Sequence, residues 1–211
     1  MNWWHTIELP NGEVTPGRVD YRGQAGDCFL LPKDLTDKRV LDFGTYDGYW
    51  AIEAKKRGAK FVIASDRWDP PLETAQYALK AYDIRYICSG DLDFPIAQVG
   101  CGDFDIVLFY GIVYHLKNPV MGLWNAARMC KPGGLVIIES AVNQGKMEGM
   151  TNDVPLLWLI DEVHHDDPSN YVMPNGAGLL QLCRMAGLNP IQTSDNHPNI
   201  HSRFTVMCER K

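Results

Sequence analysis

The sequence has no apolar run near the roughly 20 residues that a membrane-spanning helix needs. Its first residues, MNWWHT, show neither the basic start nor the apolar stretch of a secretory signal peptide. Internal repeats and low-complexity segments are also absent. These absences argue against a membrane protein, a secreted protein and a repeat array, and they predict a globular cytoplasmic protein with no membrane partner.

The six cysteines form no CxxC pair and no spacing typical of metal ligands. We therefore expect reduced, partly buried thiols. The sequence also has no run of Lys or Arg, and its net charge is −6 with a pI near 5.5. Because nucleic-acid binding needs a basic surface that neutralises phosphates, this charge balance favours a small-molecule substrate and disfavours a nucleic acid.

The 211 residues, 45% of them hydrophobic, are enough for one domain with a substantial core. From residue 38 onward, apolar strand patterns alternate with helical patterns. The predicted strands are 39–43, 60–65, 84–89, 104–110, 135–139, 188–193 and 203–209, and the predicted helices are 49–57, 71–82, 119–129 and 175–185. Such alternation predicts an α/β fold in which seven strands form a mostly parallel, doubly wound sheet.

Two segments lie outside this alternation. Residues 1–34 are expected to form an N-terminal extension, and an Asn-Gly pair within it indicates a turn that the neighbouring Pro10 weakens. Residues 35–211 form the main domain. Within it, residues 141–174 fit no β/α unit, and an irregular stretch of that length is expected to be a lid or a substrate wall after the fifth strand.

The loop after the first strand carries two glycines, in Asp42-Phe43-Gly44-Thr45-Tyr46-Asp47-Gly48. Glycines there allow a sharp turn and a close approach of a ligand to the backbone, although a purely structural turn would look the same. Asp66 ends the second strand, where an acid can accept hydrogen bonds from both hydroxyls of a ribose. Asp91 follows the third strand and can accept from an adenine amino group.

Five segments together resemble the class I S-adenosylmethionine-dependent methyltransferases: VLDFGTYDGYWAIEAKKRGA, IASD, SGDLDF, FDIVLFYGIVYHLKNP and KPGGLVIIES. The resemblance covers about residues 38–140, and nucleotide-binding dehydrogenases lack the KPGG turn. WHTIELPNGEVTPG and GIVYHLKNP are similar to the branch that contains the wobble-uridine tRNA methyltransferase-like proteins. The resemblance implies a Rossmann-like fold, S-adenosylmethionine as cofactor and S-adenosylhomocysteine as product.

The resemblance also implies a set of cofactor contacts. Gly44, Thr45 and Gly48 would surround the methionine part, Asp66 would bind the ribose, and Asp91 with the Leu92 backbone would bind the adenine. Tyr46 stands where the common family loop has a glycine, a substitution that this branch tolerates. The complete set of cofactor-binding candidates is Asp42, Gly44, Thr45, Gly48, Asp66, Arg67, Asp91, Leu92 and Tyr110.

The candidate catalytic residues, Tyr114 and His115, follow the fourth strand at the ligand side of the sheet. A histidine there can take a proton from the substrate nucleophile, because its unperturbed pKa of about 6.5 suits general base catalysis near neutral pH. The alternative is that His115 only anchors the next loop through hydrogen bonds. Tyr114 would shape the methyl pocket, as the resemblance implies, or simply pack.

Four further residues are candidates for substrate binding: Trp4, Arg18, Arg22 and Arg203. The arginines would bind an acidic substrate group, unless they are ordinary surface residues. His164-His165-Asp166-Asp167 contains metal-ligand residue types. Because adjacent residues rarely converge on one ion, we expect no metal site there.

The sequence therefore predicts direct in-line transfer of a methyl group to an oxygen or nitrogen of a small polar metabolite, with alignment as the protein's main contribution. A tRNA wobble uridine is the alternative acceptor, which the acidic pI disfavours. Two other classes remain open: a non-catalytic S-adenosylmethionine-binding module and a dinucleotide-dependent oxidoreductase. The oxidoreductase would need GxGxxG, whereas this loop reads GTYDG. The sequence makes no prediction of oligomeric state.

Overall fold

The computed structural model describes residues 1–23, 28–96, 102–143, 153–161, 167–195 and 202–211. Its helices are α1 (Tyr49–Lys56), α2 (Glu73–Ala81), α3 (Pro119–Met129) and α4 (Gly176–Met185), with a 3-10 helix η1 (Val113–His115). Its strands are β1 (Arg39–Phe43), β2 (Phe61–Asp66), β3 (Arg85–Cys88), β4 (Phe104–Tyr110), β5 (Cys130–Ala141), β6 (Leu157–Leu159), β7 (Val172–Pro174), β8 (Leu188–Ser194) and β9 (Arg203–Arg210).

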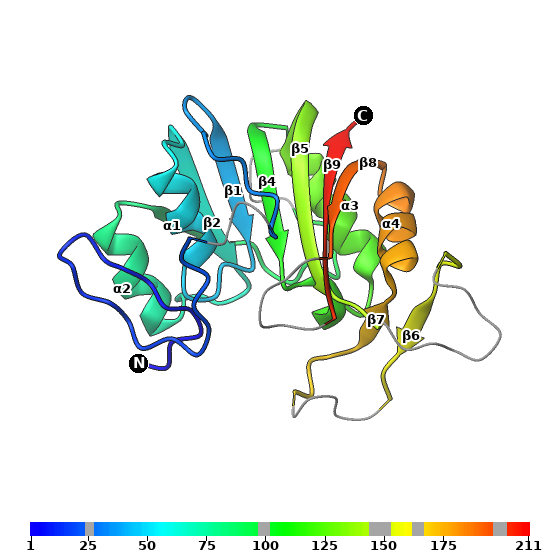
Figure 1. The fold of residues 1–211 in the computed structure, drawn as a ribbon, viewed down its shortest axis with the longest axis horizontal. Coiled ribbons are helices and arrows are strands. Elements are labelled where there is room, and N and C mark those ends of the chain that lie inside the picture. The colour runs from blue at the N-terminus through cyan, green and yellow to red at the C-terminus, as the bar shows by residue number, and fades with distance from the viewer. Residues whose placement is uncertain (24–27, 97–101, 144–152, 162–166, 196–201) are drawn as a thin grey trace.

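Seven of these strands form the central sheet, in the order β3-β2-β1-β4-β5-β9-β8 (Figure 1). β1 to β5 run parallel to one another, and β9 is antiparallel to both β5 and β8. This arrangement confirms the predicted α/β fold with a mostly parallel sheet. The chain order reverses between β1 and β4, and in open α/β sheets ligands bind at such a point, beyond the carboxyl ends of the strands.

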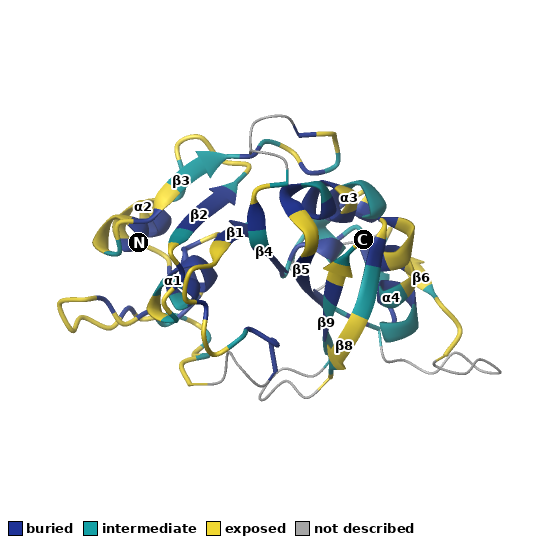
Figure 2. Ribbon diagram, turned by 90° about the horizontal axis from the view of Figure 1, so that it is seen from above, coloured by how far each residue is buried: buried dark blue, intermediate teal, exposed yellow. Residues whose placement is uncertain are grey.

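The sheet separates two hydrophobic cores because successive side chains of a strand point to opposite faces. Val40 and Leu108 belong to the core that α1 and α2 cover, whereas Leu41 and Phe109 belong to the core under α3 and α4. The central strands are consequently buried on both sides (Figure 2). This double burial explains the nearly continuous apolar sequence of β4.

The N-terminal residues pack into the first of these cores. Trp3, Ile7, Leu9 and Phe29 are all buried among side chains of α1 and α2. The expected Asn-Gly turn is present, and Glu8 and Val14 on either side of it form an isolated antiparallel bridge. In Figure 1 this N-terminal arm lies on the α1 and α2 side, near the carboxyl ends of the parallel strands.

Two strand regions differ from the expected pattern. β5 begins at Cys130, which pairs with Phe104, and the register then jumps so that Ile106 pairs with Leu135. The glycine turn at residues 131–134 therefore bulges inside the strand span, with Gly133 at φ +73°. Within residues 141–174, β6 and β7 form a short antiparallel pair that the sequence did not reveal.

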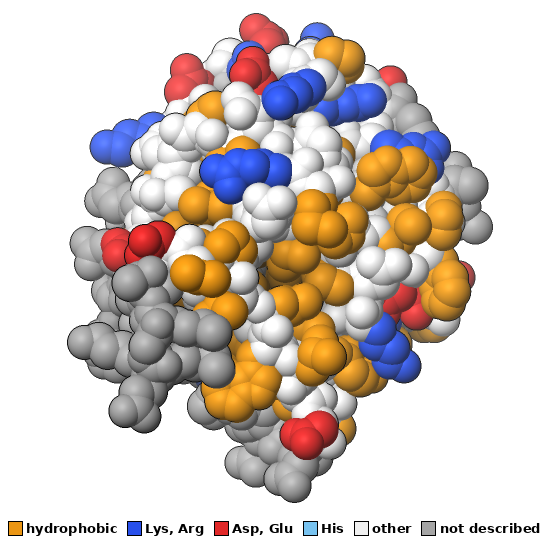
Figure 3. All heavy atoms as spheres, turned by 90° about the vertical axis from the view of Figure 1, so that its right-hand side faces the viewer, with side chains coloured by type: hydrophobic (Ala, Val, Ile, Leu, Met, Phe, Trp, Pro, Cys, Tyr) orange, Lys and Arg blue, Asp and Glu red, His pale blue; other side chains and the backbone are white. Residues whose placement is uncertain are grey.

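The end of the molecule formed by α4, β8 and the β6–β7 pair carries many apolar side chains on its surface (Figure 3). Trp158 and Leu159 of β6 are 62% and 70% exposed, and Met185 of α4 and Ile191 of β8 are also exposed. Among the helices in the described ranges, none has both the length and the apolar character required to cross a bilayer.

Candidate active site

The loop between β1 and α1 turns back over the carboxyl end of the sheet. Its Thr45 N–H donates to the Ser65 carbonyl at 2.9 Å, which fixes the loop beside the end of β2. Gly44 has φ +59°, and an added Cβ would lie 2.8 Å from Cδ1 of Ile112. Both the backbone angle and the missing space explain why this position needs glycine.

Asp42 anchors this loop from inside the protein. The side chain is buried, and its Oδ2 accepts hydrogen bonds from the Thr45 hydroxyl at 2.7 Å and the Ala51 N–H at 3.1 Å. Burial raises the pKa of this carboxyl to about 7. The described hydrogen bonds of Asp42 thus hold the loop and the start of α1 in place.

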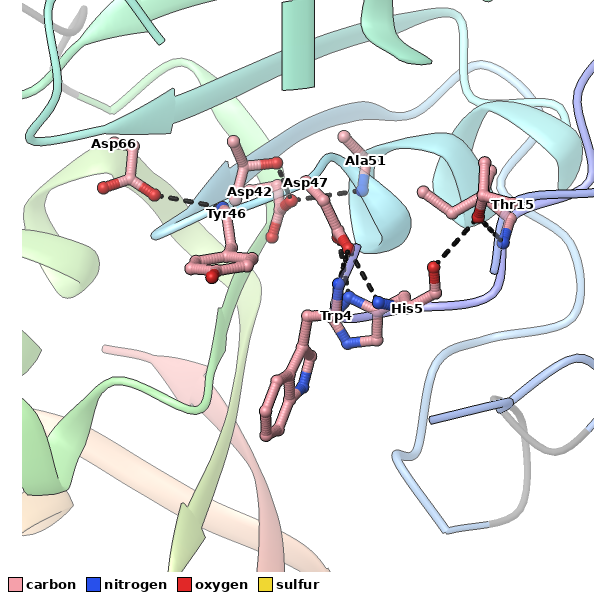
Figure 4. Close-up of polar contacts among 10 residues, drawn as sticks. Trp4, His5, Thr15, Asp42, Tyr46, Asp47, Ala51 and Asp66 are labelled. Carbon is pink, nitrogen blue, oxygen red and sulfur yellow. Dashed lines mark hydrogen bonds and ion pairs between the residues drawn. The ribbon is translucent and has the colours of Figure 1, made fainter. Parts of the chain in front are cut away.

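Asp66 projects from the end of β2 beside the same loop (Figure 4). Its Oδ2 accepts from the Tyr46 N–H at 3.0 Å and its Oδ1 from the Arg67 N–H at 2.7 Å. Burial raises the pKa of this carboxyl. Each oxygen of a carboxylate has a second acceptor direction, so Asp66 can still accept hydrogen bonds from two neighbouring hydroxyl groups.

The loop after β3 offers an exposed acid and a buried apolar side chain. Asp91 is exposed and accepts from the Asp93 N–H at 3.0 Å, whereas Leu92 is buried. Gly90 has φ +73°, and an added Cβ would meet no atom within 4 Å. The carboxylate of Asp93 accepts from the Asn118 N–H at 2.7 Å, which ties this loop to the start of α3.

Tyr110, at the end of β4, faces the α1 side of the sheet. Its hydroxyl donates to the Phe29 carbonyl at 2.8 Å, and its ring centroid lies 4.5 Å from that of Trp50. The side chain is 5% exposed. Its hydroxyl therefore binds the N-terminal arm at Phe29.

His115 lies in η1, immediately after β4, and contacts residues far along the chain. Its Nδ1 lies 3.1 Å from the Ser169 carbonyl oxygen and 3.0 Å from the Ser169 hydroxyl, which itself donates to Asp167 at 2.6 Å. A carbonyl can only accept, so Nδ1 carries the proton and Nε2 of the neutral ring is left as an acceptor. Burial lowers the pKa of His115, which keeps the ring neutral at pH 7.

Next to Tyr114 is an ion pair between the buried Glu139 of β5 and the partly buried Arg203 of β9. The Arg203 Nη2 donates to Glu139 Oε2 at 2.6 Å, and its Nε donates to the other oxygen of the same carboxylate. The guanidinium also lies over the Tyr114 ring, 5.1 Å from its centroid, and donates to the Tyr114 hydroxyl at 3.3 Å. Burial opposes the charge, but Glu139 raises the pKa of Arg203, so the cation persists.

The other substrate-binding candidates lie on the N-terminal arm. Trp4 is 43% exposed, and the Arg18 guanidinium lies 5.9 Å from its ring centroid. Arg22 is exposed and its Nη2 pairs with Asp20 at 2.7 Å. The structure therefore brings Tyr114, His115 and Arg203 together, whereas Arg22 forms its described bonds within the arm.

The described ranges contain no group of three or more His, Cys, Asp or Glu side chains able to hold a metal ion. His164, His165 and Asp166 lie outside those ranges. The expectation that this segment binds no metal stays a prediction.

The residues at this edge fit a nucleoside-containing cofactor. Asp66 retains acceptor directions for a ribose, and Gly90 borders open space. Sequence reasoning missed Glu139 and Ser169 as members of the site. An acid inside the apolar strand LVIIES was a signal for Glu139, but Ser169 lies 54 residues from its partner His115.

A protein-family model described as a methyltransferase domain matches residues 26–193. The chain is 30% identical over 203 residues to a ubiquinone biosynthesis O-methyltransferase of Neisseria meningitidis serogroup A, covering 93% of this chain and 80% of the relative. It is 27% identical over 206 residues to a tRNA U34 carboxymethyltransferase of Cellvibrio japonicus, covering 93% of this chain but 57% of that protein.

Among solved structures, an S-adenosylmethionine-dependent methyltransferase from Mesorhizobium loti superposes with a TM-score of 0.64 at 14% identity. The superposition covers 86% of this chain and 94% of that one, which supports the same fold.

Proposed function

This chain belongs to the family of S-adenosylmethionine-dependent methyltransferases, and we propose that it methylates an oxygen or nitrogen atom of a small polar metabolite. S-adenosylmethionine is the cofactor and S-adenosylhomocysteine the product. The observation that carries the proposal is the polar group of Tyr114, His115 and Arg203 beside the carboxyl ends of β4 and β5. The similarity to an O-methyltransferase over most of both chains favours oxygen as the acceptor.

In this proposal the cofactor is bound by the residues at the sheet edge. The backbone of Gly44, Thr45 and Gly48 approaches its methionine part, Asp66 accepts from its ribose, and Asp91 with the Leu92 backbone binds its adenine. When bound, S-adenosylmethionine supplies an electrophilic methyl group on a positively charged sulfur. The protein then needs mainly to align the acceptor atom and to exclude water.

His115 accepts the proton of the acceptor group through Nε2. The Nδ1 contact with Ser169 supports this role, because it fixes the neutral tautomer in which Nε2 has a free lone pair. The same contact also anchors the loop at residues 167–170. The two roles that the sequence left open are therefore compatible in one side chain.

Arg203 and Tyr114 bind a polar or acidic group of the substrate. Arg203 has five N–H donors, and its described bonds to Glu139 and Tyr114 use three of them, which leaves two for a ligand. Because Glu139 balances its charge, Arg203 contributes hydrogen bonds of fixed direction to the substrate more than a net electrostatic attraction. The Tyr171 N–H donates to the Tyr114 carbonyl at 2.8 Å, which supports residues 141–174 as a substrate wall.

A tRNA acceptor is the outcome that would most change this proposal. Relatives with that activity in their names are similar to this chain, but the Cellvibrio protein is matched over only 57% of its length. The net charge of −6 also disfavours a polyanionic substrate. A cytoplasmic location remains part of the proposal.

The test is incubation of the protein with S-adenosylmethionine carrying a ¹³C-methyl group and a panel of small phenols, carboxylic acids and amines, with bulk tRNA as a separate arm. We expect the label in an oxygen- or nitrogen-bound methyl group of a small molecule, detected by NMR and mass spectrometry. Asp66→Ala, assayed at a concentration of S-adenosylmethionine near the wild-type dissociation constant, serves as the low-activity control. Label in tRNA alone would replace the proposed acceptor, and S-adenosylmethionine binding without transfer to any acceptor would favour a binding module.

A further inference from the structure

The carboxylate of Asp47 lies in the middle of the glycine loop and is completely buried, with 0% exposure. The donors described for it come from the N-terminal arm (Figure 4). Its Oδ2 accepts from the His5 N–H at 2.7 Å and the Trp4 N–H at 3.1 Å, and its Oδ1 lies 2.7 Å from Nδ1 of His5. Residues more than 40 positions away in sequence thus satisfy this acid.

His5 is itself held in place by the arm and by α1. Its ring stacks on Tyr49, with centroids 4.8 Å apart and planes 19° apart. Its carbonyl accepts from the Thr15 hydroxyl at 3.1 Å, and Thr15 Oγ1 accepts from the Ile7 N–H at 2.8 Å. The His5 side chain is 8% exposed, so it cannot easily turn away from Asp47.

The loop that Asp47 belongs to has an unfavourable backbone path. Tyr46 has φ +51°, in the left-handed region that disfavours a side chain, and Gly48 has φ +93°. Such a path persists only where the surroundings fix it. Asp47, placed between these two residues, is the point at which the arm can fix it.

The same loop also reaches the acid proposed to bind the ribose. The Tyr46 N–H donates to Asp66 Oδ2 at 3.0 Å, so Asp66 is oriented by the residue directly before Asp47. If the arm moved away, the buried Asp47 carboxylate would lose the hydrogen-bond donors described for it. The loop would then have to rearrange so that water could reach the carboxylate. The orientation of Asp66 would change with it.

We infer that His5 is a positioning residue for the cofactor: through Asp47 it holds the glycine loop in the binding conformation, so that docking of the N-terminal arm and cofactor binding stabilise each other. The inference rests on the proposed cofactor site. It gives the arm a role in binding, although the arm supplies no residue to the cofactor contacts proposed above.

The test is calorimetric titration of S-adenosylhomocysteine into the wild-type protein and the variants His5→Ala and His5→Asn. Both variants lose the stack on Tyr49, but the Asn side-chain amide can place an N–H near the position of Nδ1 and restore the bond to Asp47. We expect His5→Ala to weaken binding by about tenfold or more and His5→Asn to remain within about threefold of the wild type.

Tyr82→Phe is the matched control, because the Tyr82 hydroxyl holds the arm through the Glu8 carbonyl, at a site away from the glycine loop. It should change affinity by less than about twofold, even if thermal stability falls. Hydrogen exchange should show faster exchange at residues 45–48 in ligand-free His5→Ala than in the wild type or Tyr82→Phe.

Equal affinity of folded His5→Ala and wild type would overturn the inference, as would an Asn variant that binds no better than the Ala variant. If His5→Ala does not fold, Asp47→Asn takes its place. That variant keeps the shape but loses the charge that binds three donors, and unchanged affinity and exchange in it would equally overturn the inference. Failure of the wild type to bind S-adenosylhomocysteine would instead overturn the proposed function and the inference with it.

Discussion

Replacement of Asp66 by alanine should weaken cofactor binding, because it removes the carboxylate proposed to bind the ribose. In the proposed complex this carboxylate accepts from ribose hydroxyls, and hydrogen bonds to a charged acceptor contribute about 1.5–3 kcal/mol. The dissociation constant of S-adenosylhomocysteine should therefore rise by about ten- to a hundredfold. Asparagine should not rescue it, because Oδ1 and Oδ2 each accept from a backbone N–H, and an amide group would oppose one of these donors.

Titration calorimetry measures this effect, with thermal unfolding as the check that the variant is folded. Glu73→Ala is the matched control, since it removes one exposed acid from the first turn of α2 and changes the net charge equally. The wild type should also lose affinity on acidification, beginning above the ordinary pKa of 3.8 because burial raises the pKa of Asp66. An affinity within about twofold of the wild type in folded Asp66→Ala would remove this residue from the site.

Three further changes test the loop, its anchor and the proposed base. Gly44→Val should abolish binding of S-adenosylhomocysteine in calorimetry, because its Cβ would clash with Ile112 at φ +59°; normal binding would mean that the loop is only structural. Asp42→Asn should be more stable than the wild type above pH 7, and this advantage should shrink as pH falls from 7 toward 3.8. Burial raises the pKa of Asp42 from 3.8 to about 7, so the stability that the protonated carboxyl gives the folded state is lost as pH rises across that interval. Chemical unfolding at pH 5 and pH 8.5 should show this difference, and a pH-independent difference would refute it. His115→Ala should lower the single-turnover rate at saturating cofactor by about a hundredfold with nearly unchanged cofactor affinity, and the wild-type rate should fall on acidification below pH 6.5; a loss below about threefold would end the assignment as a base.

The fold could be predicted because its strands are buried on both faces. Runs such as the β4 sequence FDIVLFY have no polar alternation, and their spacing between helical patterns indicates a parallel sheet. Because the carboxyl ends of parallel strands meet at one edge of a sheet, the predicted strand boundaries also placed Asp42, Asp66 and Asp91 at that edge. The β6–β7 pair was not predictable, since each strand has three residues and LWL exposes all of its side chains.

The site was predictable only where a residue's role follows from its place along a strand. The partners of Asp47 and His115 depend on how distant loops fold back, and neither helical nor strand periodicity carries that information. Arg203 was identified as a candidate at the start of the last strand. Its bond to Glu139 became visible only from the pairing of β5 with β9, which brings the two residues together across 64 positions.

A crystal structure of the protein with S-adenosylhomocysteine would locate the cofactor site directly. We expect both ribose hydroxyls within hydrogen-bonding distance of Asp66, the homocysteine part along Gly44–Gly48, and the sulfur facing Tyr114 and His115. S-adenosylhomocysteine bound elsewhere, or bound at this edge with its ribose away from Asp66, would contradict this expectation.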